Sequence, residues 1–507
     1  MRVKAWWALV SVGLVGCGGV EPETGVDVAP AEGTVQAQAC APGVAVKVKD
    51  VIAPGTPPPP PGLQSPYGLS ELQGTLFFAV DVLGGQSTLW KSNGTTAGTV
   101  PVKEFPSQGT NGYRQLADFT AVSSQLFFTI DDAVIGRELW ITNGTTAGTR
   151  LVVDLTPGPA STQLSFPAQV GGALSFFRTV SLTPTGSRLE LWKSDGTAAG
   201  TVRTVDLGTQ STVESSILRA DGQRLFFLQD AVNGTRLWRS NGTAGGTVLV
   251  KSLDRGTPLV ADVRAVGGTT LFTLRDTGPN TEIWKTDGTP AGTVRLETFG
   301  HSATLLGLIG SRVYVAYVTA DDRVKLASVL LTGGGKTTVT TLPNPFEGQP
   351  DPQPFLQEVR QEGNKIYLSL GIFYNGGPAI QASYLWVTDG TAAGTRQLSD
   401  QLSQSEDGFS PLFATGSGTL LFGSQAPDDG LEPWVTNGTV AGTGRVANIN
   451  PDGGSNPQGF TRIGHRIFFV ANAGPPGNSL WSMPANVTCL PWPPRPGRLE
   501  RIRAPPA

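Results

Sequence analysis

The sequence predicts an all-β fold built from a tandem repeat, and three observations support this. First, a motif of about a dozen residues occurs seven times, from LWKSNGTTAGT at Leu89–Thr99 to PWVTNGTVAGT at Pro433–Thr443. Second, its copies are spaced by about fifty residues. Third, each unit consists of four short apolar runs separated by turn residues, with no helix-length amphipathic period. Four strands in a unit of this length are typical of a β-propeller blade.

A tryptophan precedes the turn in most units, and the spacing of these tryptophans gives the number of blades. They are Trp90, Trp140, Trp192, Trp238, Trp284, Trp386, Trp434 and Trp481. Successive differences are 50, 52, 46, 46, 102, 48 and 47 residues. The interval of 102 residues contains a degenerate copy in which Ala327 stands at the tryptophan position. The sequence therefore predicts about nine blades, with eight as the alternative.

The second unit illustrates the four strands expected in each blade. They are FTAVSSQ (Phe119–Gln125), LFFTI (Leu126–Ile130), ELWIT (Glu138–Thr142) and TRLVVDL (Thr149–Leu155). Consecutive apolar residues such as Phe127 and Phe128 point to opposite faces of a strand. Both faces of each small sheet must therefore be covered, which blades stacked face to face achieve.

The two ends of the repeat region predict a closed ring. The last unit stops after its third strand, SLWSM at Ser479–Met483, while VAVKVKDVIAPG at Val44–Gly55 resembles a fourth strand with its exit turn. We expect this N-terminal strand to complete the last blade. Cys40 and Cys489 flank the junction, so we also expect them to form a disulfide, which an oxidising compartment permits.

The N-terminus predicts an envelope location. Arg2 and Lys4 precede an apolar run too short to span a membrane, as in a signal peptide. Leu14-Val15-Gly16-Cys17 resembles the bacterial lipobox, which implies lipidation of Cys17, and the glycine that follows favours the outer membrane. The expected organisation is a signal peptide at 1–16, the lipidated cysteine and a flexible tether at 17–43, the propeller at 44–489, and a Pro/Arg-rich tail at 490–507.

The repeated turn is expected to be structural. Its acidic or amide position is held by Asn93, Asn143, Asp195, Asn241, Asp287, Asp389 and Asn437. Because asparagine and aspartate alternate there, the negative charge is dispensable, and both residues form Asx turns. A calcium site requires several carboxylate oxygens around one ion. One such residue per unit offers too few, so we expect no cofactor, with calcium as a secondary alternative.

These units resemble the ELWxxDGT repeat family of bacterial secreted and surface proteins. The best matches are ELWKSDGTAAGT at Glu190–Thr201 and LWVTDGTAAGT at Leu385–Thr395. The resemblance covers most of Val44–Met483 and implies a propeller-like repeat protein of the cell surface. It implies no defined reaction.

Composition argues against two classes of function. Charged residues make up 15% of the chain and the net charge is −3, so no basic surface invites nucleic acid. Only two histidines are present, His301 and His465, and both are expected in exposed loops. A Ser-His-Asp triad or a multi-histidine zinc site is therefore not expected.

The remaining candidates for ligand binding lie in the loops after strands two and four, which share one face of a propeller. An acidic rim is expected there, formed by Asp131, Asp132, Asp230, Asp276, Asp321, Asp322, Asp428 and Asp429. The longest inserted loop, Gly371–Tyr384, adds the aromatic residues Phe373, Tyr374 and Tyr384. Loops that depart from a repeat often carry function.

Together these features predict a lipid-anchored, non-enzymatic binding or adhesion scaffold whose partner is a polysaccharide or a protein, and whose membrane contact is the lipid anchor alone. Two alternatives remain open. One is a polysaccharide hydrolase or lyase that uses rim carboxylates. The other is a purely structural envelope protein.

Overall fold

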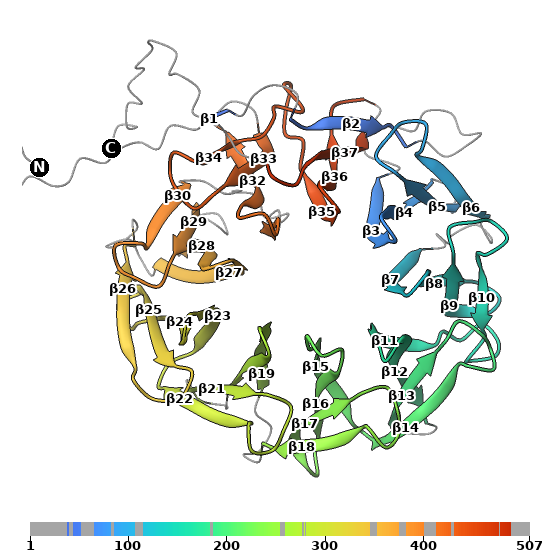
Figure 1. Ribbon diagram of the computed structural model, residues 1–507, viewed down its shortest axis with the longest axis horizontal. Helices are drawn as coiled ribbons and strands as arrows, with labels where there is room; N and C mark the ends of the chain where they lie inside the picture. The colour runs from blue at the N-terminus through green and yellow to red at the C-terminus, as the bar shows by residue number, and fades with distance from the viewer. Residues whose placement is uncertain are drawn as a thin grey trace, which may run out of the picture. The chain divides into compact units, whose positions relative to one another are not determined.

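Nine sheets arranged in a ring make up the fold of the unit Ala37–Ala507 (Figure 1). The computed structural model describes residues 38–39, 44–51, 65–82, 86–106, 115–182, 186–253, 259–275, 278, 280–344, 352–374, 382–399, 412–426, 430–475 and 477–487. Within these ranges every regular element is a strand and no helix occurs. The predicted all-β fold and the nine blades of four strands are confirmed.

Eight blades each contain four strands that are consecutive in the chain. Blade 1 has β3 (Pro66–Leu72), β4 (Thr75–Asp81), β5 (Ser87–Ser92) and β6 (Val100–Phe105); blade 2 has β7 (Leu116–Val122), β8 (Gln125–Asp132), β9 (Gly136–Thr142) and β10 (Arg150–Val153); blade 3 has β11 (Gln163–Val170), β12 (Ala173–Ser181), β13 (Ser187–Ser194) and β14 (Val202–Thr209); blade 4 has β15 (Thr212–Leu218), β16 (Arg224–Asp230), β17 (Gly234–Ser240) and β18 (Val248–Ser252).

Blade 5 has β19 (Leu259–Val266), β20 (Thr269–Arg275), β21 (Thr281–Thr286) and β22 (Val294–Phe299); blade 6 has β23 (Ala303–Ile309), β24 (Arg312–Val318), β25 (Val324–Leu330) and β26 (Thr337–Leu342); blade 7 has β27 (Pro352–Glu362), β28 (Lys365–Tyr374), β29 (Ala382–Thr388) and β30 (Arg396–Ser399); blade 8 has β31 (Phe413–Ala414), β32 (Leu420–Ala426), β33 (Gly430–Thr436) and β34 (Thr443–Arg445). Blade 9 joins β35 (Gln458–Ile463), β36 (Arg466–Asn472) and β37 (Asn478–Pro484) to β2 (Val46–Lys49).

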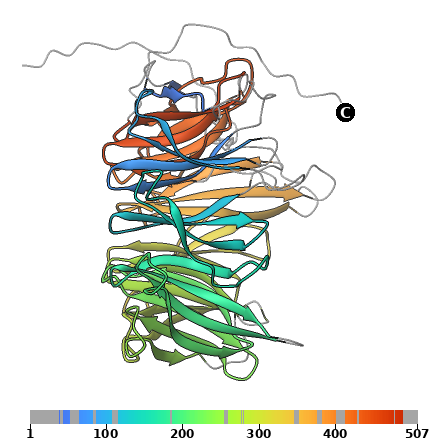
Figure 2. The same ribbon diagram turned by 90° about the vertical axis from the view of Figure 1, so that its right-hand side faces the viewer.

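Within each blade the strands are antiparallel, with the first strand toward the centre of the ring and the fourth at its outside (Figure 1). Figure 2 shows from the side that the strands run between the two faces of the ring. Hairpins between strands two and three therefore emerge on the same face as the connections from strand four to the next blade. We call this the loop face.

The core repeats from blade to blade as an aromatic pair. In blades 1, 3, 4 and 5 the tryptophan of the third strand stacks on a phenylalanine of the second, as in Phe78–Trp90 at 6.2 Å between ring centroids and Phe176–Trp192 at 6.4 Å. In blades 8 and 9 the corresponding rings are tilted. Trp90 is 3% exposed, whereas Trp192 and Trp238 are half-buried. Because second strands are buried on both faces, they read as continuous apolar runs.

Blade 4 contains a buried arginine at a position that is aliphatic in most blades. Arg224 is fully buried and, in the strand register, takes the place of Leu76 in blade 1. Its Nη2 donates to the main-chain oxygens of Phe166 at 2.7 Å and Ser175 at 2.9 Å, and its guanidinium lies 5.0 Å from the ring centroid of Phe177. Burial lowers its pKa to about 10, so it remains charged at neutral pH. This side chain ties blade 4 to blade 3.

The N-terminal strand closes the ring, as predicted. In β2, Val46 pairs with Ser482 and Lys47 with Trp481 of β37. Val48 and Val51 are 3% and 2% exposed and belong to a core cluster that also includes residues of β4 and β5 in blade 1. The first and last blades are therefore joined through a segment that precedes blade 1 in the sequence and is distant from the other three strands of blade 9.

A short strand that the sequence did not predict lies before β2, within the segment expected to be a tether. This strand, β1 (Gln38–Ala39), pairs in parallel with β34, where Ala39 lies opposite Arg445. Val487 packs in the same apolar cluster as Val446. Ala39, which precedes Cys40, and Val487, which lies shortly before Cys489, are thus both fastened to the end of blade 8, although the two cysteines lie outside the described residues.

We predict that the purified protein contains a Cys40–Cys489 disulfide, because both flanking segments are fastened at this point. Peptide mapping by mass spectrometry without reduction should find the two cysteine peptides linked, and reduction should separate them. Recovery of both cysteines as free thiols from protein isolated under oxidising conditions would contradict the pairing.

The seven repeated turns share one hydrogen-bond pattern. In the first, Asn93 Oδ1 accepts from the Thr95 N–H at 3.0 Å and from its hydroxyl at 2.8 Å, while Thr95 Oγ1 accepts from the Gly98 N–H at 2.9 Å. Ser92 and Thr99 join their hydroxyls at 2.7 Å across the base of the turn. A Cβ on Gly98 would lie 2.0 Å from Asn93 Oδ1, so glycine is required there.

These turns also join neighbouring blades. Thr96 of blade 1 donates its hydroxyl to the main-chain oxygen of Val48 at 2.8 Å, and Lys49 Nζ donates to the Thr99 oxygen at 2.8 Å. The seam between blades 1 and 2 repeats both contacts, with Thr146 bonded to Val102 O at 2.7 Å and Lys103 to Thr149 O at 2.6 Å. The turn thus latches each of these blades to the fourth strand of the preceding blade.

We predict that replacing the three turn aspartates by asparagine changes the stability of the fold only at acidic pH. Hydrogen bonds from Thr197 lower the pKa of Asp195 below its ordinary value of 3.8, and threonine bonds act alike at Asp287 and Asp389. A carboxyl with a lowered folded-state pKa stabilises the fold above its unfolded pKa, and this contribution is lost as pH falls through the lowered value. Asparagine accepts the same bonds without titrating.

The triple variant Asp195→Asn, Asp287→Asn and Asp389→Asn should therefore melt like the parent protein at pH 7 and at a higher temperature than the parent near pH 3. Asn143→Asp is the matched control and should shift the melting temperature at pH 3 in the opposite direction. A large fall in the melting temperature of the triple variant at pH 7 would mean that the negative charge of the aspartates is itself required.

Candidate functional site

The loop face carries those acidic residues of the predicted rim that fall within the described residues. Asp131 and Asp132 end β8 instead of lying in a loop. Asp131 is exposed and its Oδ2 lies 3.6 Å from Arg137 Nη2. Asp132 is 7% exposed and its Oδ1 accepts from the Val134 N–H at 2.8 Å. Both carboxylates are therefore engaged within their own hairpin.

Asp230 holds the equivalent hairpin of blade 4. Its Oδ1 accepts from the Val232 N–H at 3.0 Å and from Asn233, and its Oδ2 pairs with Arg236. Burial alone would raise the pKa of Asp230, but these hydrogen bonds hold it below the ordinary value. The residue stays ionised at neutral pH and organises the turn.

Blade 6 carries Asp321 and Asp322 in the turn between β24 and β25. Asp321 is exposed, with its Oδ2 3.6 Å from Arg323 Nε, and a hydrogen bond from Thr319 lowers its pKa. Asp322 has a φ of 54°, a left-handed conformation that suits a turn. Asp276, Asp428 and Asp429 lie outside the described residues, as does Cys17.

The longest insertion differs from the loop expected at Gly371–Tyr384. Its first part continues β28, which includes Phe373 and Tyr374, and its last part begins β29, which includes Tyr384. Tyr384 pairs with Leu370 and is partly buried against the apolar cluster shared by blades 6 and 7. Of the three aromatic residues, Tyr384 therefore packs within its blade; the side chains of the other two are not described.

Buried glutamates fix two connections on the loop face. Glu138 is 1% exposed and accepts from the Leu155 N–H at 3.0 Å and the Thr162 hydroxyl at 2.7 Å. Glu432 acts alike in blade 8, accepting from the Ile449 N–H at 2.9 Å. Burial raises the pKa of both carboxyls. In blades 2 and 8 the glutamate of the repeat therefore supports the loops above it, whereas Glu190 of blade 3 binds Trp192 and arginine side chains instead.

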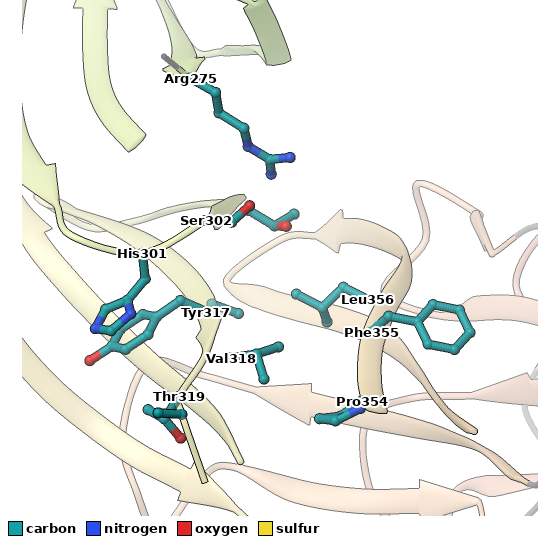
Figure 3. Close-up of a pocket in the computed structure, with 12 residues that line it drawn as sticks. Arg275, His301, Ser302, Tyr317, Val318, Thr319, Pro354, Phe355 and Leu356 are labelled. Carbon is teal, nitrogen blue, oxygen red and sulfur yellow. The ribbon is translucent and has the colours of Figure 1, made fainter. Parts of the chain in front are cut away.

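A hollow of about 470 Å³ opens on the loop face over blade 6, between blades 5 and 7 (Figure 3). It is lined by Arg275, His301, Ser302, Thr304, Ala316, Tyr317, Val318, Thr319, Ala320, Pro354, Phe355 and Leu356. Its volume falls within the range of roughly 300–1,000 Å³ found for small-molecule sites. The hollow combines an apolar floor with polar and aromatic groups at its sides.

Three side chains give this hollow its chemistry. The ring of His301 lies parallel to that of Tyr317, with 5.0 Å between centroids and 5° between planes. Arg275, the last residue of β20, extends toward Ser302 in Figure 3 and donates from Nη2 to the Ala303 oxygen at 3.1 Å. Its Nε is buried and has no hydrogen-bond partner. The hollow therefore contains both a cation and a flat aromatic surface.

The hollow coincides with the degenerate repeat. Blade 6 has Ala327 in place of the tryptophan, and its first strand is almost fully buried, with Leu305 and Leu306 at 0% exposure. Arg264 of blade 5 reaches past this strand, with Nη1 3.4 Å from the Val359 oxygen of blade 7. The strands of blade 7 are eleven and ten residues long, against seven for β23 and β24. Blade 7 therefore extends further toward the loop face than blade 6 does.

The described residues contain no group of three or more His, Cys, Asp or Glu side chains that could hold a metal ion. A search of the same residues finds no helix long and apolar enough to span a membrane.

Solved structures that resemble this chain include peptidases with propeller domains. Prolyl endopeptidases match with 11% identity and a TM-score of 0.42 over 74% of this chain and 54% of theirs. Prolyl oligopeptidase B from Galerina marginata matches with 12% identity and a TM-score of 0.43 over 71% and 55%. The propeller domain of the Trilobed protease from Pyrococcus furiosus matches with 10% identity and a TM-score of 0.36 over 64% and 95%.

This chain spans little more than half the length of the prolyl peptidases. At these identities and TM-scores, the likeness carries no argument about activity. No protein-family model and no curated protein matches the sequence. What the chain does must therefore be argued from its own residues. Its architecture is that of a propeller scaffold.

Sequence reasoning missed the residues that line the hollow. His301 was expected as an exposed loop residue, and it is exposed, but it also stacks on Tyr317. Arg275 and Tyr317 stand in no recognisable motif. The feature of the sequence that could have indicated this site is the degenerate unit, because a blade that no longer follows the repeat consensus can carry residues suited to another role.

Proposed function

We propose that this chain is a lipid-anchored envelope protein whose propeller binds a polysaccharide, without catalysis, at the hollow over blade 6. The observation that carries this proposal is the coincidence of a side-chain-lined hollow with blade 6, where Ala327 replaces the tryptophan of the repeat. The lipobox at Cys17 supports the anchor, and the resemblance to surface repeat proteins supports the location.

The hollow favours a saccharide over a purely apolar ligand. Ser302 and Thr304 offer hydroxyls, Arg275 offers a guanidinium, and the His301–Tyr317 stack offers an aromatic surface. Small-molecule sites typically combine an apolar lining with a few convergent polar groups. Sugars present both hydroxyls and apolar ring faces, so they match this mixture.

The rim carboxylates support the non-enzymatic interpretation. Asp132 and Asp230 already accept hydrogen bonds from their own hairpins, and Asp230 has its pKa lowered. A general acid in glycoside hydrolysis needs a raised pKa, and its partner carboxylate lies within about 5–10 Å across the scissile bond. Carboxylates that serve as turn caps are poorly suited to this task.

We predict saturable binding of the ectodomain, residues 18–507, to at least one envelope or matrix polysaccharide, with no release of shorter products. Isothermal titration calorimetry on a panel of polysaccharides, followed by chromatography of each ligand, measures both properties. A signal that depends on added calcium would restore the metal alternative. Absence of binding across the panel, or release of oligosaccharides, would contradict the proposal.

A further inference from the structure

We infer that the hollow over blade 6 selects sugars that carry a carboxylate, with Arg275 bound to the carboxylate and the sugar ring packed on His301. This inference rests on the proposed polysaccharide function and names the chemical class of the ligand. It makes Arg275 and His301 the residues that determine specificity.

The N–H donors of Arg275 that have no partner among the described residues indicate that the hollow binds an anion. The guanidinium has five N–H donors, of which the described residues use one, in the bond to the Ala303 oxygen. No described carboxylate lies within ion-pair distance of it, and its buried Nε lacks a partner. An arginine presents a planar fork that matches a carboxylate in a bidentate geometry. A ligand carboxylate would satisfy donors that the described residues leave open.

The stacked pair supplies the second half of the site. His301 is exposed and half-buried Tyr317 lies beneath it at 5.0 Å, so the imidazole is held in one orientation. Phe299 lies a further 5.8 Å from Tyr317 and supports it from the core. An exposed aromatic ring that is fixed in this way offers a rigid surface for the apolar face of a sugar, at low entropic cost.

The surroundings favour an acidic sugar over a peptide carboxylate. Ser302, Thr304 and Thr319 place hydroxyls around the hollow, which match the several hydroxyls of a sugar ring. A peptide would instead require a row of main-chain partners along a strand edge. In β23, the edge strand of blade 6, the N–H and the oxygen of Leu305 are already bonded to Asp262 and Arg264 of blade 5. Asp321, which follows the lining residues Thr319 and Ala320, is paired with Arg323 and opposes an anion only weakly.

The test compares oligogalacturonate with its methyl ester, which keeps the sugar rings and removes the charge. Calorimetry on the full ectodomain should show at least about tenfold tighter binding of the acid than of the ester, and the difference should shrink at high salt. Arg275→Gln should remove this preference, whereas Arg275→Lys should keep part of it. Arg137→Gln removes the same charge on the same face in blade 2, away from the hollow, and should alter affinity by less than about twofold.

His301 is tested with a pair of variants. His301→Ala should weaken binding of both ligands several-fold, whereas His301→Phe should retain it, because only the flat ring is required. Since His301 is exposed, both variants should fold like the parent protein, which melting temperatures will check. This pair keeps the inference testable if Arg275→Gln does not fold.

The outcomes separate this inference from the function beneath it. Equal binding of acid and ester, or tight acid binding unaffected by Arg275→Gln and His301→Ala, would overturn the inference while leaving polysaccharide binding in place. Preference for a short acidic peptide over oligogalacturonate would also overturn it. Binding of no polysaccharide at all would overturn the proposed function itself.

Discussion

Deletion of residues 44–52 will open the ring and destabilise blades 9 and 1 together. The deletion removes β2, the only partner of β37 on its outer side, together with Val48 and Val51 from the core shared with blade 1. It also removes the main-chain oxygen that accepts from Thr96. Burying one such aliphatic side chain is worth about 1.5–3 kcal/mol, so the total loss should reach roughly 5 kcal/mol, a large share of a typical 5–15 kcal/mol.

Limited proteolysis and calorimetric melting measure this effect. A ring of nine blades need not unfold in one step, so we expect early cleavage within blade 9 as well as a lower first transition. Deletion of the nine residues 21–29, which lie outside the unit Ala37–Ala507, is the matched control and should leave both readouts unchanged. A 44–52 deletion that melts and resists protease like the intact protein would refute closure by β2.

Trp90→Ala will cost about 3–5 kcal/mol of unfolding free energy, as large-to-small changes in aromatic cores do. Trp90 is 3% exposed, stacks on Phe78 with 12° between ring planes, and lies under Lys49 Nζ at 5.7 Å. Since Lys49 belongs to β2, loss of the ring also weakens the closing strand. Trp90→Phe keeps an aromatic partner for Phe78 and should cost much less.

Trp238→Ala provides the comparison in a blade away from the closure. Trp238 is half-buried and stacks on Phe226 at 6.4 Å, so its replacement should cost less than that of Trp90. Chemical denaturation of the three variants ranks them directly. If Trp90→Ala changed stability by less than about 1 kcal/mol, the tryptophans would be surface groups and not blade cores.

Periodicity made the fold predictable. The tryptophan spacing located every blade, including the degenerate sixth, because a blade buries the same positions each time. The missing fourth strand of the last unit predicted β2 for the same reason. The sequence could not predict Arg224. The Leu-Phe-Phe motif of β16 is displaced by one residue relative to that of β4, so Arg224, and not Leu225, takes the position of Leu76.

The site was much less predictable. Asp132 and Asp230 look like surface acids in the sequence, and only their hydrogen bonds show that they cap hairpins. The hollow unites Arg275 of blade 5 with His301 and Tyr317, and no motif in the sequence marks residues that meet across neighbouring blades. Repeat patterns predict the residues that recur from blade to blade, whereas the residues of this site lie in and beside the blade that departs from the repeat.

The threonine and lysine contacts described above between neighbouring blades bond to main-chain oxygens. They therefore do not depend on which side chain the acceptor residue carries. Thr96 binds the oxygen of Val48 and Thr146 that of Val102, and these acceptors exist whatever residue occupies the position. Gene duplication or unequal crossing-over could therefore add, remove or exchange whole units without refitting each joint. A single unit could then diverge from the repeat consensus while the joints between blades are kept, as the sixth blade has done.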